Sequence, residues 1–150
     1  MGKLEEEVKK YNIVAIDTNS FIYLMENNPK YFEEIKNMFR LIEAGVVFSV
    51  TSILMITEVL TKPLKDENYM LVNRYKAFIN AFPNLRLREV DYKVSVRAAK
   101  LRAKYGLKTP DAIFVATAFE EGVQAFITND IKLNRVEGIK IIIYKKIIKV

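Results

Sequence analysis

The amino-acid sequence predicts an α/β fold, a three-layer sandwich in which a five-stranded, mainly parallel sheet is flanked by helices. Short apolar runs alternate along the chain with longer segments of helical periodicity. Most of these runs are continuous, without the polar alternation of half-exposed strands, as is typical of parallel strands buried on both faces. The 150 residues, 51% hydrophobic and 28% charged, suit one globular domain, so we expect a single domain over residues 1–150.

The first elements are punctuated by polar caps and proline. An apolar strand is expected at 13–16, ended by Asp17-Thr18-Asn19, which can cap a helix of about 20–25. Pro29 suits the first position of a second helix, which should run to Ile42 and stop near Gly45. The β-branched and aromatic run at 46–50 is then expected to form the second strand.

The middle of the chain is predicted to be mostly helical. Thr51 or Ser52 can cap a helix to about residue 60, and Pro63 is expected to break it. Residues 66–82 carry apolar and aromatic side chains at helical spacing, so a longer helix should follow. This segment could form a dimer face, a groove for a partner protein or ordinary core. A third strand is expected at 85–90.

The last third has clear helix start and stop signals. Asp91 can cap a helix that runs to Tyr105, with Gly106 at its C-terminal end. Thr109 can cap the next helix, with Pro110 at its first position and Asp111 in its first turn, where a carboxylate suits the helix dipole. The fourth and fifth strands are expected at 125–128 and 139–144.

Composition excludes several kinds of active site. The chain has no His, Cys or Trp, so Ser-His-Asp triads, Cys-His pairs, disulfides and His or Cys zinc sites are all impossible. Any active site must therefore use carboxylates, amines, hydroxyls and backbone groups. The net charge of +6 and pI near 9.4 favour a polyanionic partner such as nucleic acid.

The sequence gives no membrane or export signal. No apolar stretch reaches the roughly 18 residues of a membrane span, and the first ten residues are highly charged. We therefore expect a soluble, cytoplasmic protein that does not bind membranes. The richness in Ile, Lys and Glu resembles that of thermophile proteins, whereas the many Asn residues point the other way.

Three of the five Asp residues lie where parallel α/β sheets bind ligands. Asp17 and Asp130 follow strands, and Asp111 opens an apolar helix. Each has a structural explanation too: Asp17 as a helix cap, Asp111 as a partner of the helix dipole, and Asp130 as a turn residue. Asp66 and Asp91 have the sequence context of simple caps.

Glu58 adds a fourth candidate acid. It lies in mid-helix among apolar residues, so we expect a buried carboxylate that needs a cation. If the four acids converge, their mutual repulsion and their oxygen-only chemistry suit Mg²⁺ or Mn²⁺. A water acidified by such an ion can attack a phosphodiester, so a hydrolytic nuclease needs no histidine.

Four segments together resemble the PIN domain family: Asp17-Thr18-Asn19, Glu58, Thr109-Pro110-Asp111-Ala112 and Thr128-Asn129-Asp130. The resemblance covers almost the whole chain and is most specific from Ala98 through Asp130. It implies a sheet in the order 3-2-1-4-5 and endoribonuclease activity with Mg²⁺ or Mn²⁺. It further implies that Asp17, Glu58, Asp111 and Asp130 are the catalytic, metal-binding acids, and that Asn19, Thr109 and Thr128 support them or contact the RNA substrate.

The chain is similar in size to the VapC-type toxins of toxin–antitoxin pairs. That similarity implies a homodimer and an antitoxin protein that silences the nuclease. The alternatives are a PIN-domain RNA-processing nuclease outside a toxin operon, a non-cleaving RNA- or protein-binding module, and a phosphoryl-transfer signalling domain. The last of these lacks a convincingly placed lysine late in the chain.

Two basic segments have open interpretations. The side chains of Lys93, Arg97, Lys100 and Lys104 project from one helix face, which is either solvated or a track for the RNA backbone. The tail that carries Lys145, Lys146 and Lys149 is either an edge strand protected by lysines or a strand that binds a partner.

Overall fold

The computed structural model describes residues 2–148. Five short strands form one parallel sheet in the order β3-β2-β1-β4-β5. They are β1 (Ile13–Ile16), β2 (Phe48–Ser52), β3 (Leu85–Arg88), β4 (Ala125–Thr128) and β5 (Lys140–Ile143). The predicted fold class and strand order are both confirmed.

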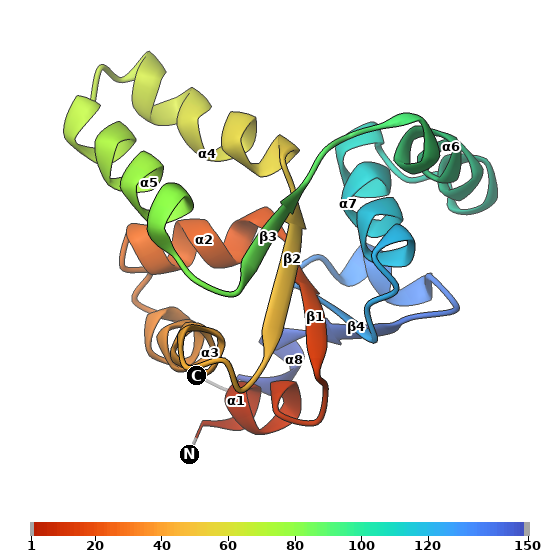
Figure 1. The fold of residues 1–150 in the computed structure, drawn as a ribbon, viewed down its shortest axis with the longest axis horizontal. Helices are drawn as coiled ribbons and strands as arrows, with labels where there is room; N and C mark the ends of the chain where they lie inside the picture. The colour runs from red at the N-terminus through yellow and green to blue at the C-terminus, as the bar shows by residue number, and fades with distance from the viewer. Residues whose placement is uncertain (1, 149–150) are drawn as a thin grey trace.

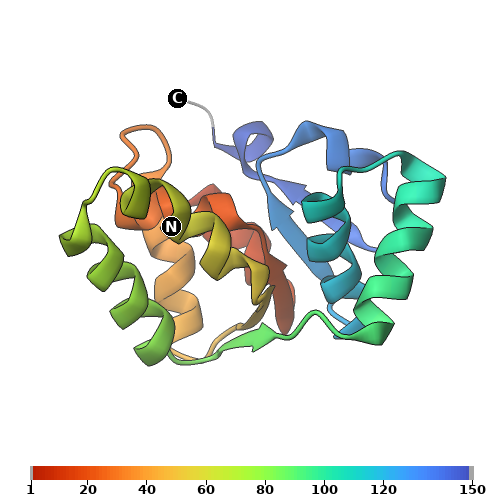
Figure 2. The same ribbon diagram turned by 90° about the horizontal axis from the view of Figure 1, so that it is seen from above.

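Helices cover both faces of the sheet, which gives three layers (Figures 1 and 2). On one side lie α1 (Lys3–Val8), α2 (Thr18–Met25), α3 (Phe32–Glu43), α4 (Leu54–Lys65) and α5 (Tyr69–Ala81). On the other lie α6 (Tyr92–Tyr105) and α7 (Thr109–Glu120), and the C-terminal part adds the 3₁₀ helix η1 (Ile131–Arg135) and the short α8 (Tyr144–Ile147). None of the helices within residues 2–148 is long and apolar enough to cross a membrane.

The core explains why the central strands are uninterrupted apolar runs. Val14, Ala15 and Ile16 of β1 are almost completely buried, as is every residue of β4. Helix α7 is also buried around most of its circumference, because it packs on the sheet with one face and on α6 with another. Asp111, in the first turn of α7, is half-buried and lies directly before the buried Ala112.

Two helix boundaries predicted from prolines differ in the structure. Helix α3 begins at Phe32 and not at Pro29, because the Asn28 side chain accepts hydrogen bonds from the N–H groups of Lys30 and Tyr31 and forms a turn there. Pro63 does not break α4, which continues to Lys65. It lies in the last turn of α4, where one backbone hydrogen bond is lost and the proline ring is buried.

Other boundaries shift by a few residues. Strand β2 spans 48–52 rather than 46–50, β3 ends at 88, and α5 begins after Asn68, whose side chain caps it. Lys108, and not Thr109, occupies the cap position of α7. The expected fifth strand of 139–144 is shortened to β5, and residues 144–147 form α8, so the basic tail up to Ile148 is no edge strand. Lys149 lies outside the described residues.

The aromatic middle segment is divided between core and surface. Tyr75 is buried, and Phe78 stacks on Phe82 with ring centroids 4.6 Å apart. In contrast, Tyr69 is 58% exposed and Met70 is 78% exposed at the start of α5. Of the three alternatives, ordinary core therefore describes Tyr75 and the partly buried Phe78 and Phe82, and not the first turn of α5.

Candidate active site

Asp17 occupies the carboxyl end of the central strand β1 and caps helix α2. Its Oδ1 accepts a hydrogen bond from the Thr18 N–H at 2.8 Å, and its Oδ2 accepts one from the Thr128 hydroxyl at 2.7 Å. Only 8% of Asp17 is exposed. The cap explanation is thus correct, but a cap alone does not require burial or a second donor from another strand.

Thr128 connects Asp17 with Asp130. It ends β4, which pairs directly with β1, and its side chain is fully buried. Its hydroxyl donates to Asp17 and also accepts from the Asp130 N–H at 3.0 Å. The Asp130 carboxylate in turn accepts from the Lys132 N–H at 2.9 Å and caps η1. One hydroxyl therefore fixes the relative positions of two acids from neighbouring strands.

Glu58 differs from the sequence prediction. It is exposed, because Met55 and Val59 form the buried face of α4 while Glu58 lies on the outer face. It is nevertheless held near Asp17, since its Oε1 accepts a hydrogen bond from the Thr18 hydroxyl. The expected buried and unpaired carboxylate is wrong, whereas the convergence with Asp17, which the sequence left open, is present in the structure.

Asp111 lies in the first turn of α7 and is half-buried. Within residues 2–148 its carboxylate accepts no hydrogen bond from another residue, in contrast to the three other acids. Its position on the buried helix α7 brings it close enough to Asp17, Glu58 and Asp130 for their charges to interact.

The electrostatics show that the four acids share one region. Burial raises the pKa of Asp17 to about 6, against the pull of its two hydrogen bonds, and the charges of Asp111 and Glu58 add to the rise. Burial also raises the pKa of Asp111, followed by the charges of Asp130 and Glu58. The positive charges of Lys108 and Lys132 oppose this second rise. The site is therefore short of positive charge.

The donor chemistry of the site fits a hard divalent cation, although its geometry is not a ready-made cage. Within residues 2–148, no three acidic side chains are grouped closely enough to hold an ion as they stand. The negative charges of the acids repel one another. In addition, hydrogen bonds from Thr18, Thr128 and Lys132 orient three carboxylates, those of Glu58, Asp17 and Asp130 respectively. All available ligands are oxygens, as Mg²⁺ and Mn²⁺ prefer. A cation would offset the burial of the Asp17 and Asp111 carboxylates, which is the main cause of their raised pKa values, and the repulsion that adds to it.

The supporting polar residues have unequal roles. Thr128 contacts an acid directly, whereas Asn19 and Thr109 make no side-chain hydrogen bond within the described part of the chain, and Thr109 is exposed. Sequence reasoning missed Thr18, although it lies between two residues that were singled out. It also missed Asn129, which is buried and accepts a hydrogen bond from the Lys145 N–H that holds α8 in place. Both residues could have been found from the sequence, because Thr18 directly follows Asp17 and Asn129 directly precedes Asp130.

Comparisons with known proteins agree with this architecture. The family model of the PIN domain matches residues 14–139, whereas no curated protein matches the chain. A toxin–antitoxin complex from Klebsiella pneumoniae is similar at 24% identity, with a TM-score of 0.65 over 84% of this chain and 94% of that one. DNA-bound VapBC from Salmonella typhimurium is 21% identical, with a TM-score of 0.62 over 85% and 95%.

A third solved structure has a title that names an RNA target. Mycobacterium tuberculosis VapC20, described as a toxin that cleaves the sarcin–ricin loop, is 17% identical, with a TM-score of 0.60 over 75% of this chain and 86% of that one. At such identities the likeness concerns the fold. The family match covers most of the chain, includes all four acids, and agrees with the strand order of the sheet. This chain therefore belongs to the PIN domain family.

Proposed function

We propose that this protein is a metal-dependent endoribonuclease that hydrolyses RNA phosphodiester bonds with Mg²⁺ or Mn²⁺. The observation that carries the proposal is the hydroxyl of Thr128, which links Asp17 to Asp130 at the carboxyl edge of the sheet. A purely structural cap would not need this link. Nor would it need the burial that raises the pKa values of Asp17 and Asp111, to which the charges of neighbouring acids add.

Each acid has a distinct role in this proposal. Asp17 and Asp130 are fixed by hydrogen bonds from hydroxyl and backbone donors, so they would provide the rigid part of the ion site. Asp111, which lacks such a donor within the described chain, would complete it. Glu58 is exposed and would bind from the solvent side. The bound ion would supply an acidified water and would stabilise negative charge at the phosphate.

We infer that the substrate is RNA and that the protein is the toxin of a VapBC-type pair, with an antitoxin as partner. The net charge of +6 supports a polyanionic substrate. The likeness to VapC20 and to two toxin–antitoxin complexes supports the toxin role. The exposed Leu64, Tyr69 and Met70 on α4 and α5 offer an apolar surface for an antitoxin or for a second copy in a homodimer.

The decisive experiment compares charge-matched variants on RNA. The purified protein is incubated with a mixed RNA pool in Mg²⁺, in Mn²⁺ and in chelator, alongside Asp111→Asn and the control Asp66→Asn. Asp66 is exposed at the end of α4 and pairs with Lys62. Cleavage should need the ion, be abolished in Asp111→Asn and persist in Asp66→Asn. Equal cleavage by all three proteins, or cleavage in chelator, would contradict the proposal.

A second readout separates the proposal from its alternatives. Calorimetry should show divalent-ion binding by the wild-type protein and weaker binding by Asp111→Asn. Ion binding without cleavage of any RNA would favour a non-cleaving module, and labelling of the protein by a small phosphodonor would favour a signalling domain. Co-purification of this protein with the product of an adjacent short reading frame would support the toxin role. The absence of such a reading frame beside its gene would favour the alternative of an RNA-processing nuclease.

A further inference from the structure

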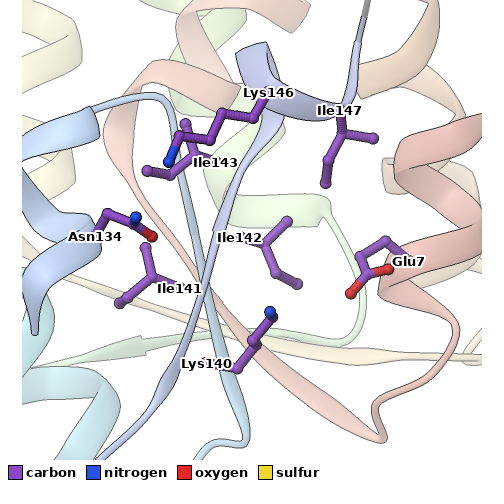
Figure 3. A pocket seen from close by; sticks show the side chains of 8 residues that line it. All are labelled: Glu7, Asn134, Lys140, Ile141, Ile142, Ile143, Lys146 and Ile147. Atoms are coloured by element: carbon purple, nitrogen blue, oxygen red, sulfur yellow. The ribbon is translucent and has the colours of Figure 1, made fainter. Parts of the chain in front are cut away.

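Two adjoining pockets lie beside Asp130, outside the group of four acids. The first has a volume of about 440 Å³ and is lined by Ile131, Lys132, Asn134 and Arg135 of η1. The second, of about 370 Å³, lies along β5 and shares Asn134 with the first (Figure 3). Asn134 thus lies at the border of both pockets, and none of the four acids is among their described lining residues.

The first pocket has the chemistry of a site for a single-stranded nucleotide. Lys132 and Arg135 offer two cations for phosphates, and the Asn134 amide can both donate and accept hydrogen bonds at a base edge. Ile131 is 50% exposed, although it is apolar, and gives a face against which an unstacked base can lie. Among the residues that the structure describes, no acidic side chain lines this pocket.

The second pocket continues the basic character. Lys140 and Lys146 lie next to isoleucine side chains of β5 (Figure 3). The side chain of Lys146 extends toward the side of the strand on which Asn134 lies. Glu7, the one acid among the described lining residues, lies on the opposite side and is paired with Lys10 at 2.8 Å. A phosphate that leaves the first pocket over Asn134 would therefore meet Lys146 before it meets Glu7.

Lys132 connects the pockets to the acids in two ways. Its N–H donates to Asp130 Oδ1 at 2.9 Å, so the start of η1 is attached to that carboxylate. Its positive charge also counteracts the rise in the pKa of Asp111. The side chain therefore lies within electrostatic range of the acids and lines the first pocket as well.

The other basic surface is less available. The basic face of α6 consists of Lys93, Arg97, Lys100 and Lys104. Of these, Arg97 donates to Glu120 and lies over the Phe119 ring at 5.4 Å. Lys104 lies over the Tyr105 ring at 5.2 Å. Two of the four charges on this face of α6 thus already interact with other groups of the protein. This favours the interpretation of the basic face of α6 as a solvated surface. The cations of η1 are therefore the better candidates for contact with RNA.

We propose that η1 and the outer side of β5 form the track that binds the single-stranded RNA segment flanking the cleaved bond. Lys132 and Arg135 bind the phosphates next to the acids, Asn134 and Ile131 contact one base, and Lys146 binds a phosphate further along. This assignment rests on the proposed nuclease function, because it names the path of that enzyme's substrate.

The test is the salt dependence of RNA binding, measured without cleavage. A fluorescent single-stranded RNA is titrated in chelator with the wild type, with Lys132→Gln/Arg135→Gln and with the control Lys93→Gln/Lys100→Gln, which removes the same charge from α6. Each phosphate contact on a single strand contributes about 0.7 to the slope of log K against log salt. Loss of two contacts should lower the slope by about 1.4 and the affinity at 0.1 M salt about 25-fold.

The outcomes separate this inference from the proposed function. The control should keep the wild-type slope, and Lys146→Gln alone should lower it by about 0.7. An unchanged slope in the η1 double variant, or an equal fall in the control, would overturn the track even if wild-type protein cleaves RNA. A selective fall in the η1 variant without cleavage by any protein would support the track and refute the nuclease. Thermal unfolding confirms that each variant is folded.

Discussion

Asp17→Asn should stabilise the fold while it removes the proposed activity. Asp17 is buried, and its pKa in the folded protein is about 6 against an ordinary value of 3.8. Above pH 6 the folded protein therefore holds a charge that the unfolded chain accommodates more easily in water. Asparagine keeps the shape, and its carbonyl can still accept the hydrogen bond from the Thr18 N–H.

The magnitude follows from the pKa difference. The difference between 3.8 and about 6, at about 1.36 kcal/mol for each pKa unit, corresponds to about 3 kcal/mol as an upper bound. For a chain of this length each 1 kcal/mol moves the midpoint of thermal unfolding by about 2–4 °C, so a rise of up to about 10 °C is expected at pH 8 in chelator.

The pH dependence has a definite sign. A carboxylate with a raised folded-state pKa binds its proton more tightly in the folded protein, so it costs stability above pH 6 and costs nothing below about pH 4. The advantage of Asp17→Asn over the wild type should therefore be full at pH 8 and disappear as the pH falls from 6 to 4.

The assay is thermal unfolding of both proteins across this pH range in chelator, with Asp91→Asn as the control. Hydrogen bonds from the Val94 N–H and from Arg88 hold the pKa of Asp91 below its usual range, so the same substitution should there reduce stability. The reasoning is refuted if Asp17→Asn is no more stable than the wild type at pH 8, or if its advantage persists at pH 4.

Three further predictions concern the link, the ion and the backbone. Thr128→Val removes the donor to Asp17 and the acceptor of the Asp130 N–H. It should lower the free energy of unfolding, measured in urea, by about 1–3 kcal/mol and raise the pKa of Asp17 further, measured by NMR titration. An unchanged pKa of Asp17 would contradict the link. Saturation with Mg²⁺ at about 100 times its dissociation constant should stabilise the wild type by about 2.7 kcal/mol but leave Asp111→Asn nearly unaffected; an equal gain in both would place the ion elsewhere. Gly106→Ala should reduce stability by about 1–2 kcal/mol, because φ of Gly106 is +67°, where a Cβ is strained. An added Cβ would meet no atom within 4 Å, so this cost comes from the backbone alone. A cost near zero in urea unfolding would show that this backbone conformation is not required.

The sequence was most informative where one local interaction decides the structure. Asp91 and Gly106 delimit α6 as predicted, because a carboxylate cap and a glycine in the left-handed region act on their own helix. The apolar runs of β1 and β4 were also predicted at their observed positions, since burial on both faces leaves no polar alternation.

Errors arose where distant contacts compete with local preference. Pro63 is an ordinary helix breaker in isolation, but it is tolerated in α4, where its ring is buried. Glu58 has apolar neighbours in sequence, yet the orientation of α4 turns it outward, and only the packing of that helix could decide this. The fifth strand was predicted to run to Tyr144, but this residue begins α8, where the Lys145 N–H donates to the side chain of Asn129 from a different segment.

The sequence by itself determined the class of chemistry. The chain has no His, Cys or Trp, so the four acids, two after strands, one in a first helical turn and one in mid-helix, provide oxygen ligands within a basic protein. It also determined the fold, because the order of the motifs and the periodicity of the apolar residues are local properties of the chain. Only the tertiary structure decided that Thr128 connects Asp17 with Asp130, that Thr18 holds Glu58, and that Asn134 joins two basic pockets. The physical reason is that these contacts join residues from different elements, and their distances depend on how the strands and helices pack together.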